Sequence, residues 1–475
     1  MSHEAVVGHI PITTGLKPEG AFACLLPWFA ASLFEGNPEV SWWIAWAGSW
    51  FIIALVFLGR VFELPRDRPM LDQVMRPWFL MHLVFAGYNF LSAIFFWFDV
   101  NGITFGLGDP IMDSSSSPEV AAQVQRLYVL AHAGLAIGMG AIRQLPKRQR
   151  VQPNRSSFTP VLLVVAMASV VLAFLLKFVA GLGQVEVKMQ GIFAVAAAVS
   201  LGVAYHERSR WFSVTVAVNV VLFVLALASG WKSGPIVMVI LIAAAFYPKS
   251  PKRTLILAGL AFAGATITLP TLSNSIRANA WRGEMTRMEA LDFAVSDLEG
   301  KTRQEIAQDT WSFLAGRLSE AALFTKYIEL VPEAYPYYEF DLLGQAAMSV
   351  VPRILWPEKV NLEELVNERV FKFDIIQPGS DVSAKPQFVV DGYLSYGAIG
   401  VFVAMLVFGA VAQLASNFCT SWLGGYLLGG VAFNGLFAIL WQGSAFEYVL
   451  NAVVWSFVLV MVLSVIGVSY GVLRK

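Results

Sequence analysis

Long, nearly uninterrupted apolar runs dominate this sequence of 475 residues, of which 57% are hydrophobic and only 14% are charged. A soluble protein of this size cannot bury so much apolar surface, which argues against a soluble enzyme or a disordered chain. Runs of roughly 15 to 25 residues are long enough to cross a bilayer as helices. We therefore predict an all-α polytopic membrane protein with about twelve transmembrane helices. The predicted spans are 20–35, 41–60, 78–98, 125–142, 158–180, 189–205, 211–229, 235–248, 254–271, 391–415, 421–441 and 446–470.

The basic residues of the short loops predict the orientation of these helices. Cytoplasmic loops of membrane proteins are enriched in Lys and Arg. If the amino terminus is cytoplasmic, one side of the membrane receives seventeen basic residues. The opposite short loops and helix ends hold only Arg126, Lys177, Lys188 and Lys232. This asymmetry predicts that both termini are cytoplasmic.

One connection is much longer than the others and divides the chain into three parts. Helices 1 to 9 fall in residues 1–271, a large exoplasmic loop in 272–390, and helices 10 to 12 in 391–475. A loop of this length between helices is usually functional or folded. Within it, the apolar periodicity of 309–331 predicts an amphipathic helix at the membrane surface. A second helix is predicted from Asp341 to Val351, ending at Pro352.

Five basic residues on the exoplasmic side are candidates for binding an anion: Lys232, Arg277, Arg282, Arg317 and Arg353. Lys232 stands just before a predicted helix N-terminus, where free N–H groups favour phosphate. The planar fork of arginine binds phosphate oxygens bidentately. The alternatives are that Lys232 snorkels to the interface and that the arginines pair with acidic residues of the same loop.

Acidic and histidine side chains near the predicted spans give further candidates. Asp391 opens the tenth span, where partial burial would suit a general base, although an N-cap is an equally good interpretation. Glu447 and Glu320 are weaker candidates for the same role. His82 and His132 lie within spans, so we expect them to form interhelical hydrogen bonds. The sequence contains no P-loop, GxGxxG, HExxH or GxSxG motif.

Three segments resemble the bacterial oligosaccharide repeat-unit polymerases of the Wzy type. They are Tyr335-Pro-Tyr-Tyr-Glu-Phe-Asp-Leu-Leu-Gly344, Val351-Pro-Arg-Ile-Leu-Trp-Pro-Glu-Lys359, and Asp391-Gly-Tyr-Leu-Ser-Tyr-Gly397 with Gly400. Members of that family look similar in having about a dozen spans, a late periplasmic loop and a PRxxWPxK element. The family usually has Glu where Asp391 stands. The detailed likeness covers roughly residues 225–415, and the remainder is similar in topology only.

The resemblance implies a glycosyltransferase of the bacterial inner membrane with a plan similar to the GT-C transferases. Such an enzyme moves a growing glycan from undecaprenyl diphosphate to a new lipid-linked oligosaccharide, with inversion and without nucleotide, metal or other cofactor. Arg353, Arg277, Arg282 and Lys232 would hold the diphosphate, and Asp391 would be the base. Trp356, Tyr393, Lys359 and Arg317 would border the substrate groove.

The partners implied by the resemblance are membrane lipid, a flippase and a chain-length regulator. The net charge of +0 gives no reason to expect nucleic acid. Two other functions stay open at this point. An O-antigen ligase would transfer finished glycan to the lipid A core. A flippase or transporter for lipid-linked sugar belongs to a different class, and would place charges deep within its spans.

Overall fold

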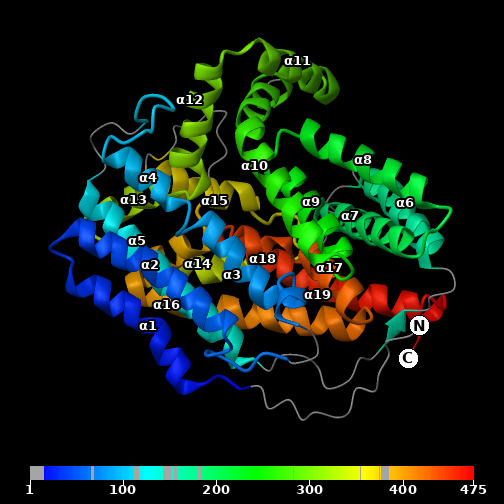
Figure 1. The fold of residues 1–475 in the computed structure, drawn as a ribbon, viewed down its shortest axis with the longest axis horizontal. Coiled ribbons are helices and arrows are strands. Elements are labelled where there is room, and N and C mark those ends of the chain that lie inside the picture. Colours follow the sequence, from blue (N-terminus) through cyan, green and yellow to red (C-terminus); the bar gives the residue numbers. More distant parts are fainter. Residues whose placement is uncertain are drawn as a thin grey trace.

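The computed structural model describes residues 15–65, 69–111, 117–142, 151–153, 158–176, 178–179, 183–281, 283–353, 355–373, 375 and 385–474. This part of the chain is almost entirely helical (Figure 1). Seven of its helices are long and apolar enough to cross a membrane. The expected class, an all-helical membrane protein, is therefore confirmed, whereas the full set of twelve spans stays a prediction.

The amino-terminal helices form one side of the molecule. They are α1 (Pro18–Leu33), α2 (Pro38–Phe57), α3 (Pro77–Tyr88), α4 (Ala93–Val100) and α5 (Pro118–Ala141). Four of them begin with proline, whose fixed φ and missing N–H suit the first turn of a helix. Nearly all of α5 is buried, because α1, α2 and α16 pack around it. The predicted span 78–98 is broken between α3 and α4.

The second group of helices, drawn in green shades in Figure 1, lies on the other side. It contains α6 (Phe158–Leu176), α7 (Gly183–His206), α8 (Phe212–Ala228), α9 (Ser233–Phe246) and α10 (Pro251–Ile276). Only 17% of the apolar window of α10 is buried, and its Ile256 and Leu257 are more than 60% exposed. Such an apolar exterior is suited to lipid rather than to water.

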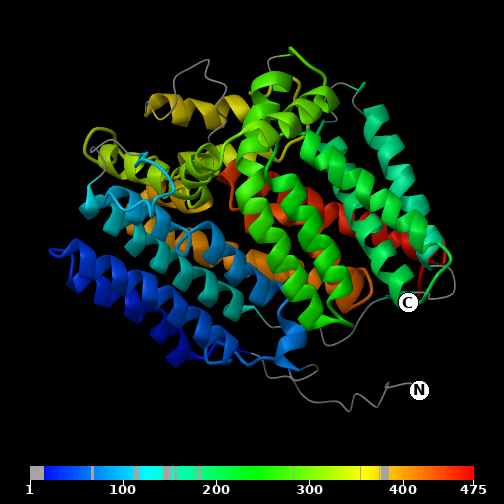
Figure 2. The ribbon, with the colours of Figure 1, turned by 45° about the horizontal axis from the view of Figure 1, so that its top comes forward.

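The carboxy-terminal helices connect the two groups (Figures 1 and 2). They are α16 (Phe388–Trp422), α17 (Tyr426–Leu436), α18 (Ala438–Gln442) and α19 (Phe446–Ser469). Helix α16 packs on α5, and α17 packs on α7 and α9. The predicted span 421–441 is thus two short helices, because the chain breaks at Phe437. Two short strands, β1 (Gln152–Pro153) and β2 (Leu473–Arg474), pair antiparallel near the end of the chain.

Helix α16 is a tight hairpin of two arms, 388–395 and 398–422. Tyr396 and Gly397 leave the helical conformation, and Gly397 has φ 58° and ψ −140°, a region that only glycine adopts readily. A Cβ on Gly400 would collide with the carbonyl of Gly392. Residues eight apart in a continuous helix lie about 12 Å apart, so this contact requires the arms to fold back on each other. The single helix expected from Asp391 onward is therefore divided into two arms at Tyr396 and Gly397.

Close backbone contact also fixes the crossing of α5 and α16. A Cβ added to Gly138 would collide with the carbonyl of Leu406, and one added to Gly409 with the carbonyl of Leu135. Gly134 and Gly138 are four residues apart, the small-xxx-small spacing that lets membrane helices approach closely. These glycines place the two most extensively packed helices in direct backbone contact.

The large loop 272–390 is mostly helical where it is described. Helix α10 runs past the expected boundary to Ile276 and continues into a π-helical turn, Arg277–Trp281. The helix predicted over 309–331 is two helices, α12 (Arg303–Phe313) and α13 (Ala321–Leu330), joined by a π-helical turn, Leu314–Leu318. The predicted second helix is confirmed as α14 (Asp341–Ser349). Two helices were not predicted, α11 (Arg287–Gly300) and α15 (Leu362–Lys372).

Candidate functional site

Three of the predicted anion-binding residues come together where α9 begins and α10 ends. We call Lys232, Arg277 and Arg317 the cation cluster. Lys232 immediately precedes α9, Arg277 follows α10, and Arg317 lies on the π-helical turn after α12. The three charges are close enough for each of the two arginines to affect Lys232 and for Arg317 to affect Arg277. Elements far apart in the sequence therefore build one positively charged surface.

The cation cluster has little compensating negative charge. The nearby carboxylate of Asp309 is already bound by the ammonium of Lys301 at 2.7 Å and by the hydroxyl of Thr271 at 2.8 Å. Within the described part of the chain, no carboxylate lies in ion-pair distance of any of the three cations. An anionic ligand would therefore find these charges unpaired.

This surplus positive charge perturbs Lys232. Burial, together with the charges of Arg277 and Arg317, lowers the pKa of the Lys232 ammonium to about 8, while Asp309 opposes the shift. Arg277 and Arg317 also repel each other. Such repulsion is relieved when an anion binds, so the site is electrostatically prepared for one.

Aromatic side chains surround the cluster. The guanidinium of Arg277 lies 4.7 Å from the ring centre of Trp281 and 5.3 Å from that of Trp231. The ammonium of Lys232 lies 4.4 Å from the ring centre of Phe313. Both tryptophans are more than one third exposed. Exposed indole faces beside cations can stack on a sugar while the cations hold its phosphate.

Glu320 places a carboxyl group next to the cluster, three residues after Arg317. It precedes α13 with φ 52°, a left-handed conformation that is uncommon outside glycine. Among the described residues its carboxylate has no hydrogen-bond partner, and it is close enough to Arg317, Tyr88 and Tyr128 to interact with them electrostatically. Burial raises the pKa of Glu320 to about 7, and Arg317 opposes that shift. The group thus has the properties of a general base, although the sequence made it only a weaker candidate.

The described polar interactions of the PRxxWPxK segment are local to the end of α14 and involve none of the three residues of the cation cluster. Arg353 and Trp356 are exposed, the latter by 41%. Lys359 is buried and donates hydrogen bonds to the carbonyls of Ser349 and Val351, so it caps the end of α14. Arg353 acts electrostatically on Lys359. Arg282, the remaining predicted cation, lies outside the described residues.

Asp391 belongs to a second, buried cluster together with Arg369 and Glu447, which we call the buried ion cluster. The guanidinium of Arg369 binds Glu447 at 2.5 and 2.9 Å and Asp391 at 3.4 Å. Asp391 also accepts a hydrogen bond from the backbone N–H of Phe446, at 2.8 Å, and so caps α19. The exposed fraction is 0% for both acids and 2% for Arg369.

This arrangement gives Asp391 the capping role that the sequence left open, at α19 rather than at its own helix. The hairpin of α16 is the physical reason, because it turns the arm 388–395 into the protein instead of toward its boundary. Tyr393 lies on the same arm, is buried, and donates its hydroxyl to the carbonyl of Val331 at 2.8 Å. Neither side chain is open to a substrate in this conformation.

Arg369 is not among the site residues predicted from the sequence. A signal was available in the spacing of Val366, Val370 and Phe373, which puts Arg369 on the apolar face of a helix. An arginine on such a face requires buried acidic partners. The burial of the side chains of Val366, Val370 and Arg369 in α15 confirms that interpretation.

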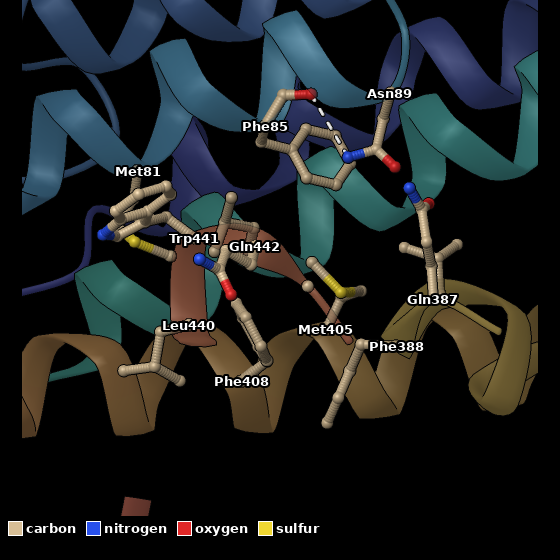
Figure 3. A pocket seen from close by; sticks show the side chains of 13 residues that line it. Met81, Phe85, Asn89, Gln387, Phe388, Met405, Phe408, Leu440, Trp441 and Gln442 are labelled. Atoms are coloured by element: carbon tan, nitrogen blue, oxygen red, sulfur yellow. Dashed lines mark hydrogen bonds between the residues drawn. The ribbon is translucent and has the colours of Figure 1, made fainter. Parts of the chain in front are cut away.

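Two smaller polar features lie inside the helix bundle. The interhelical hydrogen bonding expected of each histidine is confirmed, and the two are each other's partner, with His82 Nδ1 of α3 3.0 Å from His132 Nε2 of α5. A cavity of about 20 Å³, room for one water, lies between α3, α16 and residues 440–443 (Figure 3). The side-chain amides of Asn89 and Gln387 line it. The amide oxygens, Asn89 Oδ1 and Gln387 Oε1, have no hydrogen-bond partner in the described part of the chain.

Comparison with known proteins identifies the family of the chain. No curated protein and no solved structure matches the chain significantly. One family model matches residues 26–475, which is nearly the whole sequence. The chain therefore belongs to the family described as "Domain of unknown function (DUF8712)".

Proposed function

We propose that this protein is a membrane glycosyltransferase that polymerises lipid-linked oligosaccharide repeat units on the periplasmic face of the bacterial inner membrane. It would transfer the growing glycan from undecaprenyl diphosphate to the non-reducing sugar of a new lipid-linked unit. The observation that most supports this proposal is the cation cluster of Lys232, Arg277 and Arg317, which lacks a described carboxylate partner and is bordered by exposed tryptophans.

The cluster suits a diphosphate in particular. Two neighbouring phosphates carry several negative oxygens, and two guanidinium forks with one ammonium can contact them from different directions. Each charge-assisted hydrogen bond contributes about 1.5–3 kcal/mol. Trp231 and Trp281 offer aromatic faces to the adjoining sugar. The cluster follows an apolar helix, α10, whose exposed side could border the polyprenyl chain.

The transfer then needs one proton acceptor. The hydroxyl oxygen of the acceptor sugar attacks the anomeric carbon, the bond from that carbon to the diphosphate oxygen breaks, and the electron pair leaves with the diphosphate. The hydroxyl proton passes to a carboxylate. We assign that role to Glu320, because Asp391 is enclosed by Arg369 and would have to leave its ion pair first. A single displacement of this kind inverts the anomeric centre.

Arg353 and Trp356 have a separate place in the proposal. Between them in the sequence stands Leu355, an apolar side chain that is 76% exposed. Arginine and tryptophan among apolar residues are typical of a surface at the membrane interface. We propose that this surface contacts the lipid of a carrier rather than the reacting diphosphate.

The test is an in vitro transfer assay with the full-length protein in nanodiscs and a synthetic undecaprenyl-diphosphate oligosaccharide. The wild type should lengthen the glycan, and Arg277→Gln should bind the carrier at least tenfold more weakly. Arg303→Gln is the matched control, because it removes an exposed arginine from the neighbouring helix α12. Unchanged carrier binding in Arg277→Gln, with equal protein levels, would refute the clamp.

The two rival functions give different results in cells. Loss of a polymerase leaves single repeat units on the lipid core, and loss of a ligase leaves none, so a lipopolysaccharide gel separates them. A flippase would move labelled carrier across a sealed vesicle without lengthening the glycan. Either of those outcomes would replace the polymerase proposal.

A further inference from the structure

A second positively charged site lies at the opposite ends of α9 and α10 from the cation cluster. It is a hollow of about 590 Å³ between the α7–α8 turn and the α9–α10 turn, and we call it the two-turn pocket. Its polar lining is provided by Tyr205, His206, Arg208, Ser209, Lys249 and Ser250. The four helices that frame it lie side by side in Figure 1 and in the packing of the molecule. Neither the family model nor the proposed transfer reaction gives this pocket a role.

The pocket has positive charge without a described counter-charge. No carboxylate of the described chain lies within ion-pair distance of Arg208 or Lys249. The ammonium of Lys249 donates one hydrogen bond to the carbonyl of His206, at 3.1 Å, and has two further N–H donors. Arg208 has φ 50°, a left-handed conformation that residues other than glycine rarely adopt. The chain holds this arginine in place at some cost.

Two helix N-termini add to the positive potential. Helix α8 begins at Phe212, which itself lines the pocket, and helix α10 begins at Pro251, directly after the lining residue Ser250. Ser250 is the N-cap of α10, yet its side chain makes no capping hydrogen bond. Pro251 has no N–H, so the first turn offers the N–H groups of Lys252 and Arg253, without a serine cap. Free N–H groups at a helix N-terminus favour a phosphate.

The surroundings of the pocket indicate a lipid rather than a soluble phosphate. Tyr205 is 48% and Phe212 38% exposed, as expected of aromatic residues at a membrane interface. Beyond them, α8 presents exposed Val214 and Val221, and α10 presents exposed Ile256 and Leu257. A phosphate held in the pocket would therefore have apolar helix surfaces next to it along which acyl chains could lie. Basic pockets between helices are a known way of binding anionic headgroups.

We propose that the two-turn pocket binds the phosphate of an anionic phospholipid headgroup in the leaflet opposite to the cation cluster. The positive-inside tendency alone would place Lys and Arg on this face, but it would not require them to line a hollow. Lys252 and Arg253 show the difference. They are exposed, stand on the first turn of α10, and do not line the pocket.

The experiment compares matched double variants of the full-length protein. Each is reconstituted in nanodiscs of phosphatidylcholine with a small fraction of brominated phosphatidylglycerol, and lipid retention is read by native mass spectrometry. Arg208→Gln/Lys249→Gln should retain phosphatidylglycerol at least tenfold less than the wild type. Lys252→Gln/Arg253→Gln removes the same charge from the same face and should retain it normally. Equal loss in both would show that only diffuse surface charge matters, and would overturn the proposal.

Two further arms complete the test. Ser250→Asp places a carboxylate in the pocket while supplying a better N-cap, so it should reject the anionic lipid without loss of thermal stability. Normal lipid retention in this variant would overturn the proposal. Displacement of the lipid by millimolar inorganic phosphate would instead assign the pocket to a soluble anion. Because binding is measured without a glycan carrier, the result does not depend on the proposed transferase activity.

Discussion

The cation cluster and the buried ion cluster use similar side chains in opposite ways. In the buried ion cluster, Arg369 satisfies two carboxylates, and all three groups are almost fully removed from solvent. In the cation cluster, three positive groups share half-buried positions and repel one another. The first arrangement is complete within the protein and fixes α15, α16 and α19 relative to each other. The second is incomplete until a negative ligand arrives.

This difference separates structural charge from functional charge. A buried pair is costly to break because the remaining partner stays desolvated. A cluster of like charges without counter-ions lowers the stability of the free protein. Such a cluster therefore indicates a site that binds an oppositely charged ligand. We therefore expect substitutions in the buried ion cluster to change folding, and substitutions around the cation cluster to change binding and catalysis. The following predictions test that division.

The largest expected effect is on catalysis by Glu320→Gln. Removal of a general base should lower the rate of glycan transfer about 10²–10⁴-fold, with carrier binding and thermal stability nearly unchanged. Asp391→Asn should instead lower the unfolding temperature, because it weakens the contact with Arg369 and the cap of α19. Transfer rates of the purified variants, normalised to folded protein, check both expectations. The reverse pattern would make Asp391 the base.

The next largest effect is on stability. Arg369→Met leaves two carboxylates buried without their counter-ion, which should destabilise the protein by about 3–5 kcal/mol. The measurement is the thermal unfolding of detergent-solubilised protein. The triple variant Arg369→Met, Asp391→Asn, Glu447→Gln removes the stranded charges as well and should recover most of the loss. A fully stable Arg369→Met protein would contradict the structural role.

A smaller effect is expected from the double variant Lys232→Gln/Arg277→Gln. Carrier affinity should fall roughly 10- to 100-fold, while thermal stability stays constant or rises because the repulsion is relieved. Titration of an undecaprenyl-diphosphate analogue, together with an unfolding curve, measures both quantities. A clear loss of stability would place this cluster with the buried one.

The smallest effect concerns pH. Glu320 must be ionised to accept a proton. Burial raises the pKa of Glu320 to about 7, so the transfer rate should rise with pH up to about 7. Lys232 has a pKa lowered to about 8, so carrier binding should weaken as pH rises through that value. Lys232→Arg keeps its charge and should abolish the weakening. A rate profile that is flat from pH 6 to 9 would argue against both groups.

Much of the helical architecture could be predicted because apolar run length is a local property of the sequence. Each predicted span coincides with helical structure, and α14 and the interhelical hydrogen bonding of His82 and His132 are confirmed. The hairpin of α16 was not predicted, since hydropathy does not distinguish a helix that continues from one that folds back. The sequence signal for it is the group of glycines at 392, 397 and 400. Gly397 permits the turn, and Gly392 and Gly400 permit the close approach of the two arms.

The candidate site was predictable in part for a similar reason. Lys232, Arg277 and Arg317 were chosen from their side of the membrane, and the structure brings them together. Arg353 is predicted as a clamp residue because prolines and apolar residues flank it, but neighbours along the chain do not determine which cations it meets in space. Arg369 was missed because an arginine in a charged-looking helix resembles a solvated residue until its apolar neighbours are considered.

The hairpin of α16 has a consequence for how the topology of this chain should be mapped. The arm 388–395 adds apolar length without adding a crossing, so α16 can cross the membrane only through 398–422. Cysteines introduced along the short arm should be protected from reagents applied to either side of the membrane. Hydropathy assigns these positions to one long span. Cysteine labelling should instead give an unlabelled stretch along the short arm that ends at Tyr396, which is 39% exposed.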